Sequence, residues 1–323
     1  MVFTINCTRV PIPEGTTLFG IPLGIGPAPA SPGPASDHDA PTSALNDGAA
    51  LNLSRRATPN GEEPGPIQPH ARILNCRKQT IISSLNGRTL GPLGSLDELI
   101  ECTKSQSIDI LAIQEHRFYH PKDNLKYHEA GSFQFITSSA TKNSNNSSVG
   151  GVGFLLSPKA SNNLLSIESI CPRIMVLTLE GNPQTTVICV YSPHNASSDD
   201  DINDFYSTLR TTVEQVPLHN FLVVAGDLNA KLGPNDARFT FNPDTNRNGE
   251  LLVDFMDEFN LFSANTSFMK PNGQLWTFEY PNGDRAQLDY LLFRKKWRNS
   301  VKTPDLFHPL ALWALTTEWS LLR

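Results

Sequence analysis

Phe221-Leu222-Val223-Val224-Ala225 is followed directly by Gly226-Asp227-Leu228-Asn229-Ala230. A short apolar run that contains β-branched residues and ends at a glycine is typical of a buried strand. The sequence therefore places a carboxylate and an amide immediately after such a strand. Because a strand end holds a functional side chain more rigidly than a long loop does, we expect a site at this point of the fold.

Similar apolar runs occur on both sides of this stretch. Strands are predicted over residues 80–85, 108–113, 149–156, 174–179, 185–191 and 287–293. Apolar residues at helical spacing predict helices over 199–216 and 249–259, and Ser95-Leu96-Asp97-Glu98 has the form of a capping box that opens another helix. Many strands with few helices indicate an α+β fold in which two β-sheets pack face to face with helices outside.

The composition limits how the chain can bind nucleic acid. Acidic residues (32) outnumber Lys and Arg (26), so the net charge is −6 and binding by bulk positive charge is excluded. No apolar run approaches the length of about 20 residues that a membrane span needs, and residues 1–19 lack the pattern of a signal peptide. The five cysteines are odd in number and widely spread, which predicts an intracellular protein with reduced thiols and no disulfide partner.

The chain is expected to divide into three parts. Residues 1–71 are predicted to be disordered, because residues 1–70 hold 12 of the 25 Pro and 8 of the 21 Gly and cannot bury enough apolar surface to offset their ordering entropy. Residues 72–302 carry the strand and helix patterns and are predicted to form the folded domain. Residues 303–323 form a separate tail.

Polar clusters follow four of the predicted strands, at residues 85–89, 114–117, 191–195 (Tyr191-Ser192-Pro193-His194-Asn195) and 226–230. A turn or cap role is the commoner one for each cluster alone, and for Glu115 the alternative is a salt bridge with Arg117 or Arg88. Taken together, the clusters offer hard oxygen donors and no thiolate, which favours Mg²⁺ over zinc. The donors are Asn86, Glu115, Asp227 and Asn229. The pattern therefore indicates a phosphate-processing site.

In their order along the chain, these residues resemble the motifs of the endonuclease/exonuclease/phosphatase superfamily, which includes DNase I and the apurinic endonucleases. The motifs are Asn86, Gln114-Glu115, Tyr191, Gly226-Asp227-Leu228-Asn229-Ala230, Trp276-Thr277 and Leu288-Asp289-Tyr290. The resemblance covers about residues 72–302. Residues 226–239 and 246–302, including Asn246-Arg247-Asn248-Gly249-Glu250, are most similar to the apurinic-endonuclease-like endonuclease domain of non-LTR retrotransposons of the LINE type, RTE-like elements among them.

The resemblance implies a DNase I-like, four-layered αββα sandwich of two mixed β-sheets flanked by helices, with the site at the top of the sheets. It also implies cleavage of one DNA strand with Mg²⁺, or with Mn²⁺ as the alternative ion. Glu115 would hold the metal with Asn86 close by. Asp227 would take the proton from the attacking water, which Asn229 would orient, and Tyr191 would contact the scissile phosphate.

Four further side chains are predicted near the substrate. Arg88 and Arg117 lie beside the expected ligands and are placed to touch a phosphate, although pairing with nearby carboxylates is the commoner role of such residues. By the resemblance, Thr277 would contact DNA or support the site. Asp289 is an acid inside an apolar strand, so it either accepts hydrogen bonds from backbone amides or orients a histidine.

The tail departs from the family. Its members end in a Ser-Asp-His motif, whose His binds the phosphate and pairs with the Asp at position 289, followed by a last core strand; neither is present after Lys302. If the codons of residues 311–319 are read one base earlier, Trp313 followed by Ala314 forces a glycine, and the next codons permit Ser-Asp-His-Arg. We therefore expect that a one-base frameshift, in the gene or in its reading, separates this tail from its ancestor.

The sequence leaves three functions open. The first is a Mg²⁺-dependent, DNA-nicking endonuclease of a LINE-type retrotransposon, impaired by loss of the C-terminal His. The second is a decayed, non-catalytic relic that binds DNA weakly, and the third is a phosphomonoesterase on the same fold. The expected partner is DNA, with no membrane partner and a monomer assumed, and a nuclear location follows only from that substrate.

Overall fold

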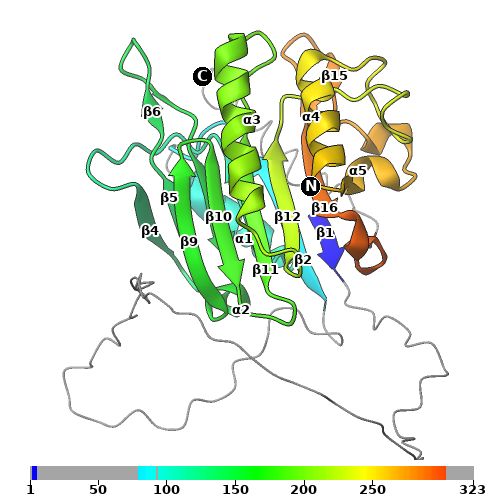
Figure 1. Cartoon of the computed structure of the whole chain (residues 1–323). Helices are drawn as coiled ribbons and strands as arrows, with labels where there is room; N and C mark the ends of the chain where they lie inside the picture. Colours follow the sequence, from blue (N-terminus) through cyan, green and yellow to red (C-terminus); the bar gives the residue numbers. More distant parts are fainter. Residues whose placement is uncertain (1, 6–78, 92–93, 303–323) are drawn as a thin grey trace, which may run out of the picture. The chain divides into compact units, whose positions relative to one another are not determined.

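The computed structural model describes residues 2–5, 79–91 and 94–302, all of which belong to one compact unit. Two six-stranded mixed sheets form its centre (Figure 1). The first sheet has the order β1-β2-β3-β8-β5-β4. Its strands are β1 (Val2–Ile5), β2 (Thr80–Asn86), β3 (Ile110–Gln114), β4 (Leu125–Ala130), β5 (Phe133–Ser138) and β8 (Val152–Leu156).

The second sheet has the order β13-β16-β12-β11-β10-β9. Its strands are β9 (Leu164–Cys171), β10 (Ile174–Leu179), β11 (Thr185–Tyr191), β12 (Phe221–Asp227), β13 (Leu261–Ser263) and β16 (Asp289–Arg294). Each sheet contains one parallel pair, β2 with β3 and β11 with β12, among antiparallel neighbours. The parallel pairs matter for function because their carboxyl ends lie at the same edge of the sheet.

Short elements complete the fold. Two small antiparallel pairs are β6 (Thr141–Lys142) with β7 (Ser148–Val149), and β14 (Phe278–Glu279) with β15 (Arg285–Ala286). The helices are α1 (Ser95–Ser105), α2 (Pro158–Ser161), α3 (Asp199–Glu214), α4 (Arg247–Glu258) and α5 (Ala264–Ser267), with 3-10 turns η1 (Asn272–Gln274) and η2 (Lys295–Ser300).

Apolar residues of the strands face two different cores, because successive side chains point to opposite sides of a sheet. In β11, Val187 and Cys189 join the core between the two sheets, whereas Ile188 and Val190 pack under α3 and α4. These two helices cover the outer face of the second sheet in Figure 1. Helix α1 packs with Leu99 and neighbouring residues on the outer face of the first sheet. The predicted α+β fold with two packed mixed sheets between helices is therefore confirmed.

Three sequence-based expectations are corrected by the structure. The predicted disorder of residues 1–71 is wrong for residues 2–5, which form β1 and pair antiparallel with Thr80–Ser83 of β2; nothing in the sequence pattern marks so distant a partner. The capping box at Ser95 is wrong, because Gly94 holds the N-cap position and Ser95 already begins the helix. The strand predicted over 149–156 is divided, with β7 ending at Val149 and β8 beginning at Val152.

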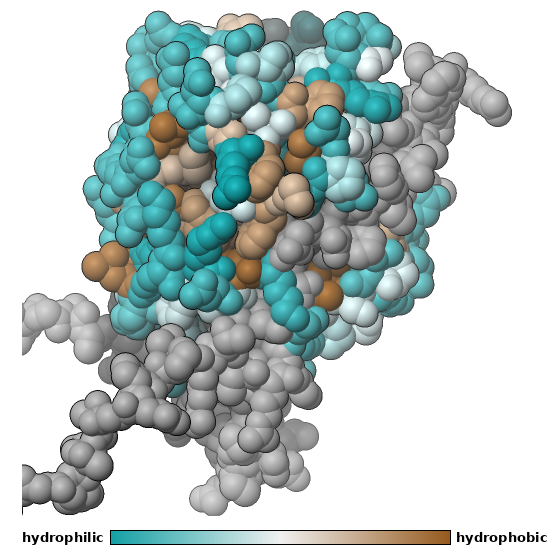
Figure 2. Space-filling model, turned by 90° about the vertical axis from the view of Figure 1, so that its right-hand side faces the viewer, coloured by the Kyte–Doolittle hydropathy of each residue, from teal (hydrophilic) through white to brown (hydrophobic). Residues whose placement is uncertain are grey.

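The rest of residues 1–71 and the tail 303–323 lie outside the described residues. In the described part of the chain, no helix combines the length and the apolar character that crossing a bilayer requires. Seen from the side that is on the right in Figure 1, hydrophilic residues cover most of the coloured surface, and apolar residues occur in small groups between them (Figure 2).

Candidate active site

The predicted site residues meet where strands of both sheets end. Asn86 is the last residue of β2, and Glu115 follows the last residue of β3. Tyr191 and Asp227 end the parallel strands β11 and β12 and are register partners. The next pairing, between β12 and β16, places Asp289 opposite Asp227. Gly226 permits the close approach of β12 to β11 just before Asp227, because a Cβ at this position would overlap the Val190 carbonyl oxygen.

Asp227 is buried and connects the two sheets. Its Oδ2 accepts a hydrogen bond of 2.9 Å from the Asn86 amide nitrogen, and its Oδ1 accepts one of 2.9 Å from the backbone N–H of Asn229. Burial raises the pKa of Asp227 well above its ordinary value, and the negative charges of Asp289 and Glu115 raise it further. Carboxylates this close attract a cation or share a proton.

Thr277, just before β14, fixes the backbone at Asp289. The Thr277 hydroxyl accepts the backbone N–H groups of Leu288 (2.9 Å) and Asp289 (3.1 Å). Burial raises the pKa of the Asp289 carboxyl, while the hydrogen bond with the Thr277 side chain and the charge of Arg88 lower it. Thr277 therefore supports this strand and does not line the pocket, so the predicted choice between DNA contact and support favours support in this structure.

Glu115 lies across the pocket from Asp227. Its Oε1 accepts a hydrogen bond of 2.5 Å from the Tyr191 hydroxyl, and its Oε2 lies 3.8 Å from Arg117 Nη2. Burial and the charge of Glu115 raise the pKa of Tyr191 well above its ordinary value, so the phenol stays protonated and remains a donor. Of the expected alternatives for Glu115, the ion pair with Arg117 is present as a long contact with a half-exposed arginine.

The backbone at the site adopts an uncommon conformation. Arg88, Glu115, Arg117 and Asn229 all have φ between 47° and 61°. Positive φ costs a residue other than glycine free energy and tends to occur where function requires it. All four of these residues line the same pocket. Positive φ therefore occurs in three separate loops that line one pocket.

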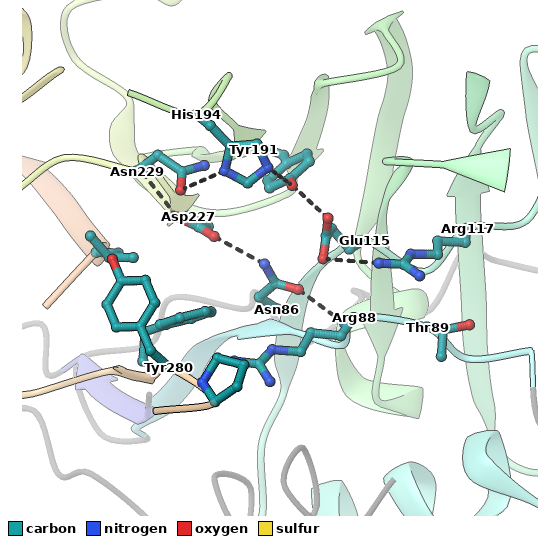
Figure 3. A pocket seen from close by; sticks show the side chains of 13 residues that line it. Asn86, Arg88, Thr89, Glu115, Arg117, Tyr191, His194, Asp227, Asn229 and Tyr280 are labelled. Carbon is teal, nitrogen blue, oxygen red and sulfur yellow. Dashed lines mark hydrogen bonds and ion pairs between the residues drawn. The ribbon is translucent and has the colours of Figure 1, made fainter. Parts of the chain in front are cut away.

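The pocket encloses about 450 Å³ (Figure 3). Seven of the nine predicted site residues line it, namely Asn86, Arg88, Glu115, Arg117, Tyr191, Asp227 and Asn229. Arg88 lies over the ring of Phe278, 4.4 Å from its centroid, and donates to the Glu279 carbonyl. A neighbouring pocket of about 610 Å³ shares Glu115, Arg117, Tyr191 and His194 with the first and also contains Arg173. The two pockets therefore flank the Glu115–Tyr191 contact.

Three site features lie outside the predicted set. His194 lines both pockets, and Phe278 and Tyr280 form an aromatic wall of the first. The third feature is the Asn246 side chain, whose Oδ1 accepts the backbone N–H of Lys231 (2.9 Å) and so fixes the loop after Asp227. The sequence did mark two of these residues, since His194 belongs to one of the polar clusters and Asn246 to the quoted motif. Neither pattern shows which way a loop side chain points.

The oxygen donors of this site fit a hard divalent cation. Mg²⁺ is usually bound through one or two carboxylates while it keeps several waters. Glu115 supplies such a carboxylate beside the pocket, and the Asn86 side-chain oxygen, which accepts the backbone N–H of Arg88 at 3.0 Å, has a second lone pair. In the described part of the chain, no three His, Cys, Asp or Glu side chains form a metal-binding group.

Comparisons with known proteins give a consistent result. The model of the Endonuclease/Exonuclease/phosphatase family matches residues 74–308. Craniofacial development protein 2 of Tragulus javanicus is 28% identical over 240 residues, which cover 72% of this chain and 40% of that protein; that of Bos taurus is 27% identical over 240 residues, 72% and 39%. The chain thus spans about two fifths of the length of these curated relatives.

Solved structures share the fold at low identity. A 3′ phosphatase, NExo, from Neisseria, bound to a product DNA hairpin, has a TM-score of 0.51 at 15% identity, over 67% of this chain and 86% of that one. The endonuclease domain of TRAS1, a telomere-specific non-LTR retrotransposon, has a TM-score of 0.43 at 12% identity, over 67% and 83%. At 15% identity the likeness to NExo shows the fold alone, and no conclusion is drawn from the lower score of the TRAS1 domain.

Proposed function

The chain belongs to the endonuclease/exonuclease/phosphatase family, whose members hydrolyse phosphate esters, and we propose that it is a metal-dependent phosphodiesterase that nicks DNA. One observation carries the proposal. Hydrogen bonds from Asn86 to Asp227 and from Tyr191 to Glu115 gather groups from both sheets around one pocket. The arrangement places a general base, Asp227, and a hydrogen-bond donor, Tyr191, beside the same phosphate. It also places oxygen ligands for a metal there.

We propose a role for each residue of the candidate site. Asp227 accepts the proton of the attacking water, and its buried position keeps it from competing interactions with solvent. Asn229 orients that water, since the Asp227–Asn229 loop is fixed by their hydrogen bond. The Tyr191 hydroxyl contacts a phosphate oxygen, which it reaches by exchanging its hydrogen bond with Glu115.

Glu115 and Asn86 are the residues that would hold the metal. A bound Mg²⁺, or Mn²⁺ in its place, supplies charge neutralisation to the phosphate and to the leaving oxygen. Nucleases of this superfamily generally use divalent metals. Arg88 and Arg117 flank the same pocket and are proposed to contact phosphates of the substrate.

The second pocket favours a diester over a monoester substrate. A monoester needs room on one side of the reacting phosphate, whereas an internal diester continues on both sides. Here a pocket of about 450 Å³ and another of about 610 Å³ meet at Glu115, Arg117 and Tyr191. The phosphomonoesterase alternative is therefore the weaker one, although the structural neighbour from Neisseria is a 3′ phosphatase.

The proposed origin of the domain rests on sequence resemblance. Residues 226–239 and 246–302 resemble the endonuclease domain of LINE-type retrotransposons, so we propose that the domain descends from one and acts on DNA in the nucleus. A one-base frameshift near Lys302 or Thr303 remains part of the proposal. Sequencing the transcript across codons 298–320 tests it, because codons that cannot spell Asp-His in the shifted frame would exclude it.

Activity on defined substrates tests the function. The full chain is incubated with Mg²⁺ and bis(p-nitrophenyl) phosphate or p-nitrophenyl phosphate, with Asp227→Ala as control. We expect the wild type to hydrolyse the diester and little of the monoester. Asp227→Ala should hydrolyse the diester about 10²-fold to 10⁴-fold more slowly than wild type. Preference for the monoester would support the phosphatase alternative. Activity on neither would support the decayed relic.

A further inference from the structure

The first turn of α4 contacts both loops that carry the candidate site. The loop after β11 leads from Tyr191 to α3, and the loop after β12 leads from Asp227 through Asn229. Gly249 allows the helix to approach, because a Cβ at this position would overlap the Lys231 carbonyl oxygen. The helix therefore touches the backbone that follows the two parallel strands.

Asn248 in this turn joins the two loops. Its side chain is buried, and its amide nitrogen donates to the Pro193 carbonyl at 3.0 Å and to the Asn229 carbonyl at 3.3 Å. A primary amide carries two hydrogens, one for each acceptor. Pro193 lies two residues after Tyr191, and Asn229 lies two residues after Asp227. One side chain thus connects segments next to the proposed phosphate contact and the proposed base.

Neighbouring bonds hold Asn248 in place. Its backbone N–H donates to the Asn195 side-chain oxygen at 3.3 Å, and its carbonyl accepts from the Tyr206 hydroxyl of α3 at 3.1 Å. The adjacent Arg247 guanidinium donates to the carbonyls of Asn195 at 2.6 Å and Ser197 at 2.9 Å. The backbone of Asn248 is thus fixed on both sides, which limits the directions open to its amide.

Other bonds at the two loops do not duplicate this link. The Ser192 N–H donates to the Asp227 carbonyl at 2.9 Å, and the Asn229 amide nitrogen donates to the Ser192 carbonyl at 2.9 Å. The side-chain bonds of Asn246 go to the loop after β12 and to α4 itself. Asn248 adds a connection one residue further along the loop after β11.

Asn163 offers a matched comparison. It is also buried, and its amide nitrogen donates to a backbone carbonyl, that of Lys159, at 2.8 Å. Within the described residues, the side-chain oxygens of Asn163 and Asn248 both lack a hydrogen-bond partner. Asn163 lies between α2 and β9 and lines neither pocket of the site. The two asparagines therefore differ chiefly in the segments that their amides hold.

We propose that Asn248 is a positioning residue that fixes Asn229 relative to Tyr191. Asn229, the proposed water-orienting residue, has a φ of 47°, and bonds to its carbonyl help to hold this costly conformation. A misplacement of about 1 Å in a reacting geometry can cost about 10²-fold in rate. The proposal rests on the proposed function and goes beyond it, because it assigns the relative placement of the two loops to a side chain outside the pocket.

Steady-state kinetics compare the two buried asparagines. Asn248→Ala and Asn163→Ala are made in the full chain and assayed on bis(p-nitrophenyl) phosphate with Mg²⁺. His219→Ala is the surface control, because His219 is exposed and lines neither pocket. Both buried variants lose an amide donor, so both should unfold at a lower urea concentration than wild type.

Only Asn248→Ala should lower kcat, by about 10-fold to 100-fold, with KM within about 2-fold of wild type. Asn248→Ser, which keeps one donor hydrogen, should recover part of the loss. Equal losses of kcat in Asn248→Ala and Asn163→Ala, or no loss in either, would overturn the proposal. Where Asn248→Ala does not fold, Asn248→Ser carries the same comparison.

Amide hydrogen exchange supplies a readout that does not depend on turnover. The N–H groups of Ser192 and Asn229 both donate to Asp227, so loosening of the loops should expose them to solvent. We expect these two amides to exchange about 10-fold faster in Asn248→Ala than in wild type, and within about 2-fold of wild type in Asn163→Ala. Unchanged exchange in Asn248→Ala would overturn the proposal. A wild type that hydrolyses no diester, together with faster exchange in Asn248→Ala, would reject the proposed function and leave the positioning of the loops standing.

Discussion

Replacing Asn246 by Ala or by Asp tests how the fold holds the catalytic loop. The Asn246 Oδ1 accepts the N–H of Gly249 at 2.8 Å, which caps α4, and the N–H of Lys231 at 2.9 Å, which fixes the chain after Asp227. Its amide nitrogen donates a longer bond, 3.3 Å, to the Asn229 carbonyl. Helix cap and loop anchor are therefore one side chain.

The two variants remove different parts of this network. Ala removes the cap, which costs about 1 kcal/mol, and leaves the Lys231 N–H without its partner, which costs ~1–2 kcal/mol more. Asp keeps both acceptor bonds, adds a favourable charge at the helix N-terminus, and loses only the longest bond. We expect the free energy of unfolding to fall by about 2–3 kcal/mol in Asn246→Ala and by less than ~1 kcal/mol in Asn246→Asp.

Urea unfolding followed by circular dichroism measures both changes, with diester hydrolysis assayed on the same samples at a temperature where each variant is folded. Activity should follow the same order, because the loop that is released carries Asn229. Equal destabilisation by Ala and Asp would refute the reasoning, since the acceptor bonds would then contribute nothing. Lost stability with full activity in Asn246→Ala would separate the cap from the site.

Two further predictions concern the Tyr191 hydroxyl and the imidazoles of His120 and His128. Tyr191→Phe removes the donor to Glu115 and should slow diester hydrolysis about 10²-fold while thermal unfolding changes little; an unchanged rate would remove Tyr191 from the site. Burial lowers the pKa of His120 and of His128 in the folded chain, so the unfolded chain takes up protons more readily and stability is lost as pH falls below about 6.5. Urea unfolding at pH 7.5 and 5.5 should show a smaller decrease in the double Gln variant of these two residues than in wild type, and an equal decrease in both would contradict the assignment.

Much of the interior of the fold was predictable because most residues of its buried strands are apolar or β-branched. The ranges 174–179 and 185–191 agree with β10 and β11 residue for residue. Apart from β1, four strands of the two sheets were not predicted, namely β4, β5, β9 and the three-residue β13. Strands β4 and β9 lie at sheet edges and are partly exposed, and the buried β5 interrupts its apolar residues with Gln134 and Thr137, so the apolar signal is weak in all three. Pairing of residues 2–5 with β2 depends on a contact about 78 residues away in sequence, for which no local pattern exists.

The candidate site was predictable to the extent that its residues end strands. Asn86, Tyr191 and Asp227 do so, and parallel pairing then brings such ends together. The direction of a loop side chain is not contained in the pattern, which is why His194 escaped selection although its cluster was noticed. Thr277 shows the converse, since a motif residue turned out to hold the backbone of Asp289 instead of lining the pocket.

Nicking of supercoiled plasmid DNA in Mg²⁺ tests most directly whether residues from both sheets form one phosphodiesterase site. The chain is compared with Glu115→Gln and Asp227→Ala, which alter opposite sides of the pocket, and with His219→Ala. We expect the wild type and His219→Ala to convert supercoiled into open-circular DNA, chelation to stop both, and either site variant to lose the activity. Nicking that survives both site substitutions, or a wild type that nicks nothing while remaining folded, would contradict the account.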